Sequence, residues 1–311
     1  MSSPSIANHR FGFGYYRQTY WNWLIGSAFF MGGVGASTFL LSLITGFRLG
    51  MIVGYLIVVL GKNAAHIKFL GRPERFWRAA MRPDRSWIAR GIWATGFFAL
   101  GGFICLLPEG QLAGWVLPAF ILSAARWLAM LSAFVIMFYD GFVMNASPGI
   151  AFWNSKLLPV LILMYASLGG TTMSLTLREL TGVHDAAKPL LEQYEHTLLL
   201  LNLLLLATYL MRMSRWTPAA RETVNMLLRG PYAKVFFGLV IAVGLVATFL
   251  LSIVQNVVET RWLVALIALT ELTGDFALVM VLLKSGLFSP QSAPVPQKFA
   301  GGLAQAGVIS R

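Results

Sequence analysis

The first long apolar stretch, residues 21–46, reads WNWLIGSAFFMGGVGASTFLLSLITG and carries no charged residue. It is long enough to cross a hydrocarbon core of about 30 Å, which takes roughly 20 helical residues. Similar stretches recur along the chain. We predict membrane spans at residues 21–46, 50–69, 88–107, 112–139, 157–177, 196–209, 235–253 and 262–283. The expected fold class is therefore all-α, a polytopic membrane protein of about eight transmembrane helices.

Composition supports a membrane fold. Of the 311 residues 57% are hydrophobic and 12% are charged, and the mean hydropathy is +0.70. A soluble core cannot bury this much apolar surface. Residues 1–20 are polar and aromatic, with no small-residue cleavage site before the first span. We therefore expect no cleaved signal peptide, and a first span that stays as an anchor.

The net charge of +12 would suggest nucleic acid as a partner of a soluble protein, but here it has a membrane explanation. Because each span crosses the membrane, successive loops are expected on alternate sides. The side that holds both termini carries nearly all of the basic residues, and the other side carries only Arg48, Arg178, Lys188 and Arg261. By the positive-inside rule we expect a multi-pass protein of the bacterial inner membrane, with both termini cytoplasmic and no nucleic acid bound.

Two passages of the chain are similar. YWN at 20–22 precedes the small-residue run at 32–38, and FWN at 152–154 precedes a similar run at 167–172. We predict a leader at 1–20, a membrane domain at 21–285 made of four-helix halves at 21–140 and 152–285, and an extended or disordered tail at 286–311. Chance similarity between apolar helices is the alternative, and close helix packing is the ordinary use of small residues.

Polar side chains from several spans are expected near the basic face. They are Tyr20, Trp21, Asn22, Lys62, Asn63, His66, Arg90, Tyr139, Asp140, Trp153, Asn154 and Lys156. A quinone suits such a site, because its carbonyl oxygens need donors and its reduction needs protons. Lys62 and His66 share a helix face, His66 is suited to moving protons, and Asn22 or Tyr139 can donate to a carbonyl. Alternatively, the aromatic residues form an ordinary interfacial belt and Lys62 extends to the interface.

A second polar group is expected deeper in the membrane. It comprises Arg126 in the fourth span with Glu271 and Asp275 in the eighth. Each ionisable side chain at that depth costs about 2.5–3.5 kcal/mol on insertion, so we expect the three to face inward and to pair. They form either a proton path or a buried salt bridge that stabilises packing.

Metal cofactors are disfavoured for this chain. Cys105 is the single cysteine, which excludes an internal disulfide and an iron–sulfur cluster held by this chain alone. A transmembrane haem usually needs two histidines at one depth, whereas His66 is expected at one face and His184 and His196 at the other. We predict no haem, no iron–sulfur cluster and no other metal site.

One motif points to a family. Residues 66–77 read HIKFLGRPERFW, and SWIARG follows at 86–91. Together with the glycine-rich first span and the YDGFVMNASPGIAFWNS passage, they resemble the NrfD family, the membrane subunits of polysulfide-reductase-type complexes. The resemblance covers most of residues 20–285.

The resemblance implies a quinone-reactive membrane anchor without cofactors of its own. Its partners would be an iron–sulfur subunit and, beyond it, a molybdopterin or other catalytic subunit, and its ligand menaquinone or ubiquinone. By motif, the quinone pocket would contain Asn22 and Tyr139, next to Trp21, with His66 and Arg72 nearby. Some relatives have a histidine where this chain has Gly26, which shifts the proton-donor role to His66 or Lys62.

The basic loop at 68–90 has two possible roles. It binds anionic lipid, or it also docks an acidic patch of the iron–sulfur subunit. We favour docking, because Arg72, Arg75, Arg78 and Arg82 follow each other at three- and four-residue spacing and Pro73 suits the start of a short interfacial helix.

The leading hypothesis is a quinone/quinol oxidoreductase subunit, inactive alone, in which His66, Lys62 or Asp140 handles protons. One rival is a secondary transporter that uses Arg126, Glu271 and Asp275 as its substrate or ion site. The other is a passive membrane anchor for another enzyme.

Overall fold

The protein is a bundle of long apolar helices, and its computed structural model describes residues 15–112, 114–255, 257–258 and 260–289. Within these ranges eight helices are long and apolar enough to cross a membrane, which confirms the predicted fold class. The first four spans are α1 (Trp23–Ile44), then α2 (Arg48–Leu56) continuing through the π-helical η2 (Ile57–Lys62) into α3 (Asn63–Phe69), then α4 (Trp87–Leu106) and α5 (Ala119–Asn145). The last four are α6 (Leu157–Thr181), α7 (Ala187–Ser214), the continuous α9 (Ala233–Val235), η5 (Phe236–Ala247) and α10 (Thr248–Gln255), and α11 (Arg261–Lys284).

Two predicted spans differ from the structure. The fourth begins at Ala119 rather than 112, because the short η4 (Pro108–Gly110) and a hairpin of β2 (Gln111–Leu112) and β3 (Trp115–Val116) precede it. Gly110 and Gly114 there have φ of +69° and +85°, a region that favours glycine. The sixth span is longer at both ends than 196–209, because charged residues near its ends lower the hydropathy without interrupting the helix.

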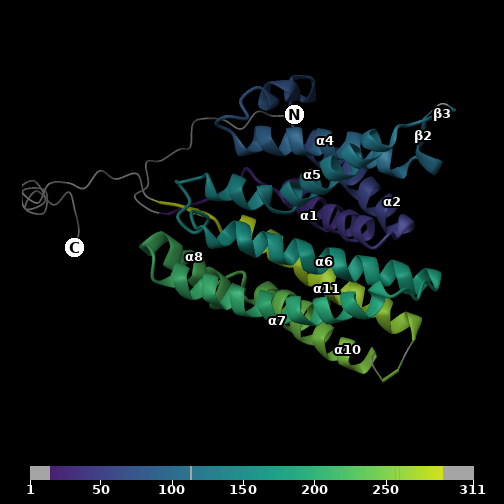
Figure 1. Cartoon of the computed structure of the whole chain (residues 1–311). Helices are drawn as coiled ribbons and strands as arrows, with labels where there is room; N and C mark the ends of the chain where they lie inside the picture. The colour runs from purple at the N-terminus through teal and green to yellow at the C-terminus, as the bar shows by residue number, and fades with distance from the viewer. Residues whose placement is uncertain (1–14, 113, 256, 259, 290–311) are drawn as a thin grey trace, which may run out of the picture.

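Short elements close the basic end of the bundle. The 3₁₀ helix η3 (Pro73–Ala80) begins at the expected proline, and α8 (Pro218–Leu228) was not predicted. Strand β1 (Tyr16–Arg17) pairs antiparallel with β4 (Leu287–Phe288), so part of the predicted tail is a strand, while residues 290–311 lie outside the described range. Both ends of the described chain therefore meet at one end of the bundle, as an even number of spans requires (Figure 1).

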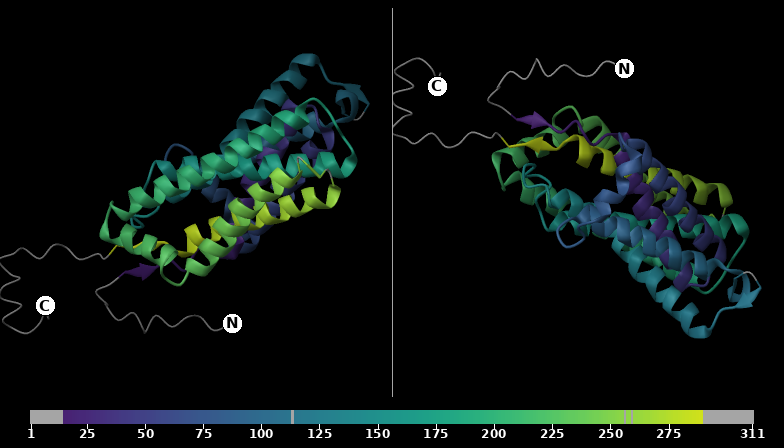
Figure 2. Two further views of the ribbon diagram at one scale, coloured as in Figure 1. Left: turned by 90° about the horizontal axis from the view of Figure 1, so that it is seen from below. Right: turned by 90° about the horizontal axis from the view of Figure 1, so that it is seen from above.

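Helix α1 is central in the bundle. It contacts α2, α5, α6 and α11, and Figures 1 and 2 show α4 and α5 on one side of this centre and α7 and α10 on the other. Small residues make the close approach possible: a Cβ on Gly33 would lie 2.9 Å from the Cβ of Ala166, and one on Gly170 2.2 Å from the Ser37 hydroxyl. The small-residue runs of α1 and α6 thus pack against each other. The division into two halves stays a prediction.

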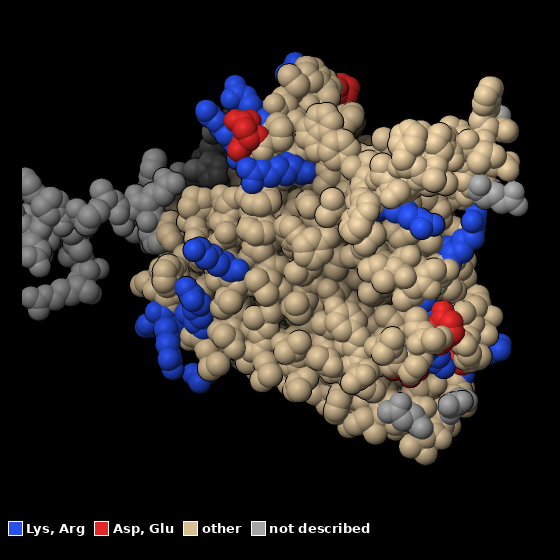
Figure 3. All heavy atoms as spheres, viewed as in Figure 1, with Lys and Arg blue, Asp and Glu red and all other residues tan. Residues whose placement is uncertain are grey.

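Charge lies at the two ends of the molecule. On the face shown in Figure 3, Lys and Arg gather, with a few acidic residues, at the end where β1 pairs with β4; acidic and basic residues also mix at the other end, and the middle is largely free of charge. An apolar belt between charged ends is the surface that a bilayer requires.

Candidate functional site

Lys62 ends the π-helical segment η2 and is buried, with 3% of its surface exposed. Its Nζ donates to Thr95 Oγ1 over 3.1 Å and lies 5.1 Å from the centroid of the Tyr139 ring. The Thr95 hydroxyl itself donates to the Gly91 carbonyl, which leaves a lone pair for the ammonium group. Because the aliphatic stem lies against Gly32, 3.0 Å from where a Cβ would be, the side chain points into the bundle.

Tyr139 and Asp140 of α5 complete the surroundings of Lys62. Tyr139 fills the space above Gly91, where a Cβ would come within 2.2 Å of its ring. The Asp140 carboxylate is 1% exposed and attracts the Lys62 ammonium electrostatically. Its Oδ1 has no hydrogen-bond partner among the described residues. A buried oxygen without a partner costs free energy, so this position suits a proton or a donor group.

His66 lies one helical turn after Lys62, toward the basic end. Its Nδ1 is 3.1 Å from the Lys62 carbonyl oxygen, which can only accept, so Nδ1 carries the hydrogen. In the neutral ring Nε2 is then an acceptor. The His66 ring lies 6.4 Å from Phe29, and Phe29 packs edge-on against Trp21, which stacks on Trp153 at 5.0 Å. His66 therefore sits beside an aromatic wall.

Two predicted quinone contacts have other surroundings. Asn22 caps α1, because its Oδ1 accepts from the Leu24 amide over 2.9 Å, which leaves its side-chain NH₂ as a donor. Arg72 is exposed immediately before η3, and none of its described contacts reaches His66 or Trp21. The structure brings Lys62, His66, Tyr139, Asp140 and Trp21 to one region of the basic half, with Asn22 at its rim and Arg72 outside it.

Gln18 was missed by the sequence analysis. Its buried side chain donates to the carbonyls of Trp21 (3.0 Å) and Leu283 (2.9 Å) and accepts from the Trp21 amide (2.9 Å). It thus ties the start of α1 to the end of α11 beside the aromatic wall. A glutamine within a polar leader carries no signal of this role.

The predicted pairing of Arg126 with Glu271 and Asp275 is not what the structure shows. Arg126 is exposed on α5 and lies near Cys105, whereas Glu271 and Asp275 are 0% and 3% exposed on α11. The prediction failed because the helix begins at Ala119, about two turns before Arg126, and because an almost uniformly apolar span does not indicate which of its sides faces the interior.

Glu271 instead meets residues of α6 and α7 that the sequence analysis did not single out. Thr172 Oγ1 lies 2.5 Å from Glu271 Oε2 and 2.5 Å from Glu195 Oε1. Both Thr172 and Glu195 are buried. Glu195 immediately precedes the predicted start of the sixth span, so it was read as part of a loop.

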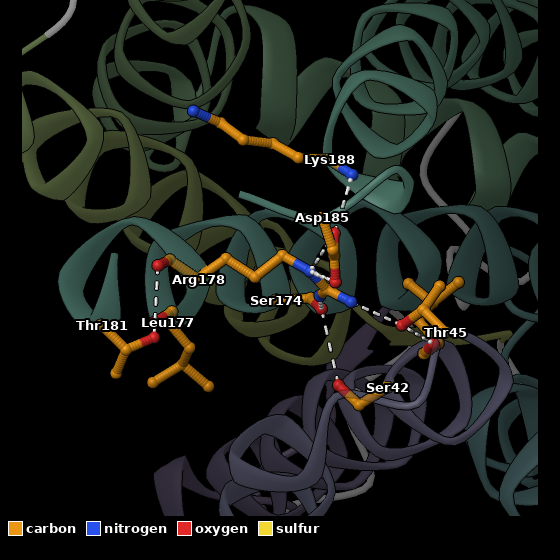
Figure 4. A network of polar contacts seen from close by, with 9 residues as sticks. Ser42, Thr45, Ser174, Leu177, Arg178, Thr181, Asp185 and Lys188 are labelled. Atoms are coloured by element: carbon orange, nitrogen blue, oxygen red, sulfur yellow. Dashed lines mark hydrogen bonds and ion pairs between the residues drawn. The ribbon is translucent and has the colours of Figure 1, made fainter. Parts of the chain in front are cut away.

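Arg178, which was counted as a loop charge of the less basic side, is fully buried at the end of α6 (Figure 4). It donates to Ser174 (2.6 Å) and Thr45 (2.5 Å) and forms an ion pair with Asp185 at 3.3 Å. These contacts join the α1–α2 connection to the α6–α7 connection. We interpret this network as a packing clamp.

Residues suited to metal binding do not gather in the described part of the chain. No group of three His, Cys, Asp or Glu side chains there could hold a metal ion.

Comparison with known proteins places the chain in a family. The family model described as "Polysulphide reductase, NrfD" matches residues 13–290. A search of curated proteins gave no match. Members of the matched family are membrane subunits of quinone-interacting redox enzyme complexes. As the HIKFLGRPERFW motif predicted, this chain belongs to the NrfD family.

Proposed function

We propose that the chain holds the head group of a quinone or quinol at its basic end and passes electrons between it and an iron–sulfur partner. The observation that carries the proposal is the Lys62 ammonium, buried against Thr95 and Tyr139 and attracted by Asp140, with His66 one turn away. A buried cation is costly in a membrane, and such groups usually serve a function.

The side chains have separable roles in this proposal. A bound quinone supplies two carbonyl oxygens that accept hydrogen bonds, and the electron-accepting ring. Lys62 and the Asn22 amide supply donors, and Trp21 and Phe29 offer aromatic surface. His66 Nε2 accepts or returns a proton near the basic end, and the unpartnered Asp140 Oδ1 provides a second proton acceptor.

Docking of the partner is proposed on η3. Arg72, Arg75, Arg78 and Arg82 are exposed, as are Phe76 (55%) and Trp77 (51%), and η3 has no buried residue. Exposed aromatic and arginine side chains together are typical of a protein interface. We propose that the iron–sulfur subunit binds here, that a molybdopterin-type subunit follows it, and that this end is cytoplasmic.

Substitution in the assembled complex tests the quinone site. In Lys62→Met and His66→Ala we expect quinone-linked activity to fall at least about tenfold, because a positioned donor or proton-transfer group is lost. Reduction of the iron–sulfur partner by an artificial donor should stay unchanged. Lys68→Met, on the same helix but exposed, is the matched control. Normal quinone turnover in both variants would favour the passive-anchor alternative.

The docking surface has its own test. Replacing Arg75, Arg78 and Arg82 together by glutamine should release the partner at lower salt than in the unchanged complex, because docking then lacks three charges. Equal salt resistance on co-purification would contradict docking at η3.

The transporter alternative places a substrate or ion at Glu271 and Asp275. It is favoured only by their burial and unpartnered oxygens, since Arg126 does not join them. Solute flux by the isolated chain in vesicles would support it.

A further inference from the structure

We propose that Glu195, Thr172 and Glu271 form a proton-binding site that exchanges protons with the aqueous phase at the end opposite the basic one. The site is built from α6, α7 and α11 and is separate from Lys62 and His66. The proposal does not depend on the proposed function, because its experiments need neither quinone nor a partner.

The contacts of Thr172 are best satisfied by a proton on one of the two carboxyl groups beside it. A threonine hydroxyl has one hydrogen, yet Thr172 Oγ1 lies within hydrogen-bond distance of two carboxyl oxygens, one from Glu195 and one from Glu271. The hydroxyl can donate to only one of them. The other contact is a hydrogen bond only if that carboxyl group carries a proton and donates to Thr172. Transfer along Glu195, Thr172 and Glu271 then changes which carboxyl is neutral, without moving a heavy atom far.

Further acceptors continue from Glu271 toward the centre of the bundle. Glu271 Oε1 and both oxygens of Asp275, one turn away, have no hydrogen-bond partner in the described ranges. The Tyr165 hydroxyl, in a side chain that is 4% exposed, also has none there, and it interacts electrostatically with both carboxyl groups. Unpaired polar groups at this depth are costly unless protons or water satisfy them. This independent observation indicates that the cluster takes up a small polar ligand.

A cavity connects the site to the opposite end. Its lining includes the buried Thr172, Glu195 and Ser252, together with Glu179, Lys188, Glu192, His196 and Gln255. Ser252 and Glu195 are only 3% and 5% exposed, whereas the side chains of Lys188 and Glu192 are 21% and 38% exposed, so Lys188 and Glu192 lie at the outer end of the cavity. The volume of about 40 Å³ has room for about three or four waters, since one needs roughly 10–15 Å³.

Charged residues line the mouth of this cavity. Lys188 forms ion pairs with Glu179 at 2.9 Å and Glu192 at 3.8 Å, beside the Arg178 network. A polar mouth favours water, and a chain of water, carboxyl and hydroxyl groups suits protons. A metal ion is a poorer occupant, because no described group of three His, Cys, Asp or Glu residues could hold one.

Infrared spectra of the purified full chain test the shared proton. We expect a protonated-carboxyl band at neutral pH that shifts in D₂O and weakens in Glu195→Gln and Glu271→Gln. Thr172→Val should shift it, because the bridging hydroxyl is lost. Thr171→Val is the matched control: Thr171 is equally buried, but its hydroxyl bonds only the Ser167 carbonyl of its own helix. An unchanged band in both glutamine variants, or equal effects of the two valine variants, would overturn the proposal.

Thiol labelling tests the side of access and remains informative if a carboxyl variant does not fold. In a Cys105→Ser background, Glu192→Cys at the mouth of the cavity, where the Glu192 side chain is 38% exposed, should react with a membrane-impermeant thiol reagent only from the side opposite the termini. Lys68→Cys, exposed at the basic end, should react only from the other side. Reaction of Glu192→Cys solely from the basic side, or from neither side, would refute the cavity as an access route. Loss of quinone activity in Lys62→Met would not alter either readout, so the two proposals fail independently.

Discussion

Replacement of Lys62 by methionine isolates the buried charge of the basic half. Methionine keeps the length of the apolar stem but removes the ammonium group. The charge-assisted bond to Thr95 contributes about 1.5–3 kcal/mol, and the desolvated contact with the Tyr139 ring about 2 kcal/mol. The variant also leaves Asp140 buried without its compensating cation. Loss of one partner of a buried charge pair typically costs about 3–5 kcal/mol, so we expect a loss of that size in the free energy of unfolding.

The double variant Lys62→Met with Asp140→Asn decides whether the two charges stabilise one another. Once Asp140 is neutral, the missing ammonium no longer leaves a charge unpaired. We therefore expect the double variant to be more stable than the sum of the single losses predicts, by about 1–3 kcal/mol. The penalty in Lys62→Met alone should shrink as the pH is lowered, because protonation of Asp140 removes the uncompensated charge.

Reversible unfolding of the purified chain in mixed detergent micelles provides the measurement. The single and double variants and the unchanged chain are compared at neutral and at acidic pH. Additivity within about 0.5 kcal/mol would mean that Lys62 and Asp140 are energetically independent. In that case the Lys62 ammonium and the Asp140 carboxylate do not stabilise each other, and the quinone site proposed around Lys62 loses its main support.

Two further substitutions test the packing of the bundle. Gly33→Leu should destabilise the chain by about 1–3 kcal/mol, because even its Cβ would lie 2.9 Å from the Ala166 Cβ. Gly96→Leu is the control and should have little effect, because the space around Gly96 is open. Equal thermal unfolding of the two variants would contradict the α1–α6 contact. Arg178→Met should lower the free energy of unfolding by about 3 kcal/mol, because it removes a fully buried guanidinium from Asp185, Ser174 and Thr45. Arg261→Met, at an exposed position of the same end, is the control and should lower it little. An Arg178→Met chain as stable as this control in detergent unfolding would refute the packing clamp.

Much of the candidate site was visible in the sequence because a charge inside an apolar run is conspicuous. Glu271 and Asp275 were singled out on that ground, whereas Lys62 was expected among the polar residues near the basic face, and the structure buries all three. The sequence did not single out Glu195, because it adjoins polar residues at a helix end. It did not single out Thr172 either, because threonine is common in runs of small residues through which helices pack. The prediction for Arg126 was wrong in two respects: the helix begins at Ala119, so Arg126 lies near its start rather than near its middle, and its side chain is exposed rather than directed inward.

The sequence by itself determined the number of spans, the meeting of both ends of the described chain at one end of the bundle, and the accumulation of basic residues there. These properties follow from local hydropathy and from counting charges in loops, since each span needs only length and apolarity to insert. The tertiary structure alone decided which polar groups face one another, from Lys62 with Thr95 to the two carboxyl groups at Thr172. Helix rotation is set by close contacts such as Gly33 with Ala166, and helices that are apolar on every side do not encode those contacts in their hydropathy pattern.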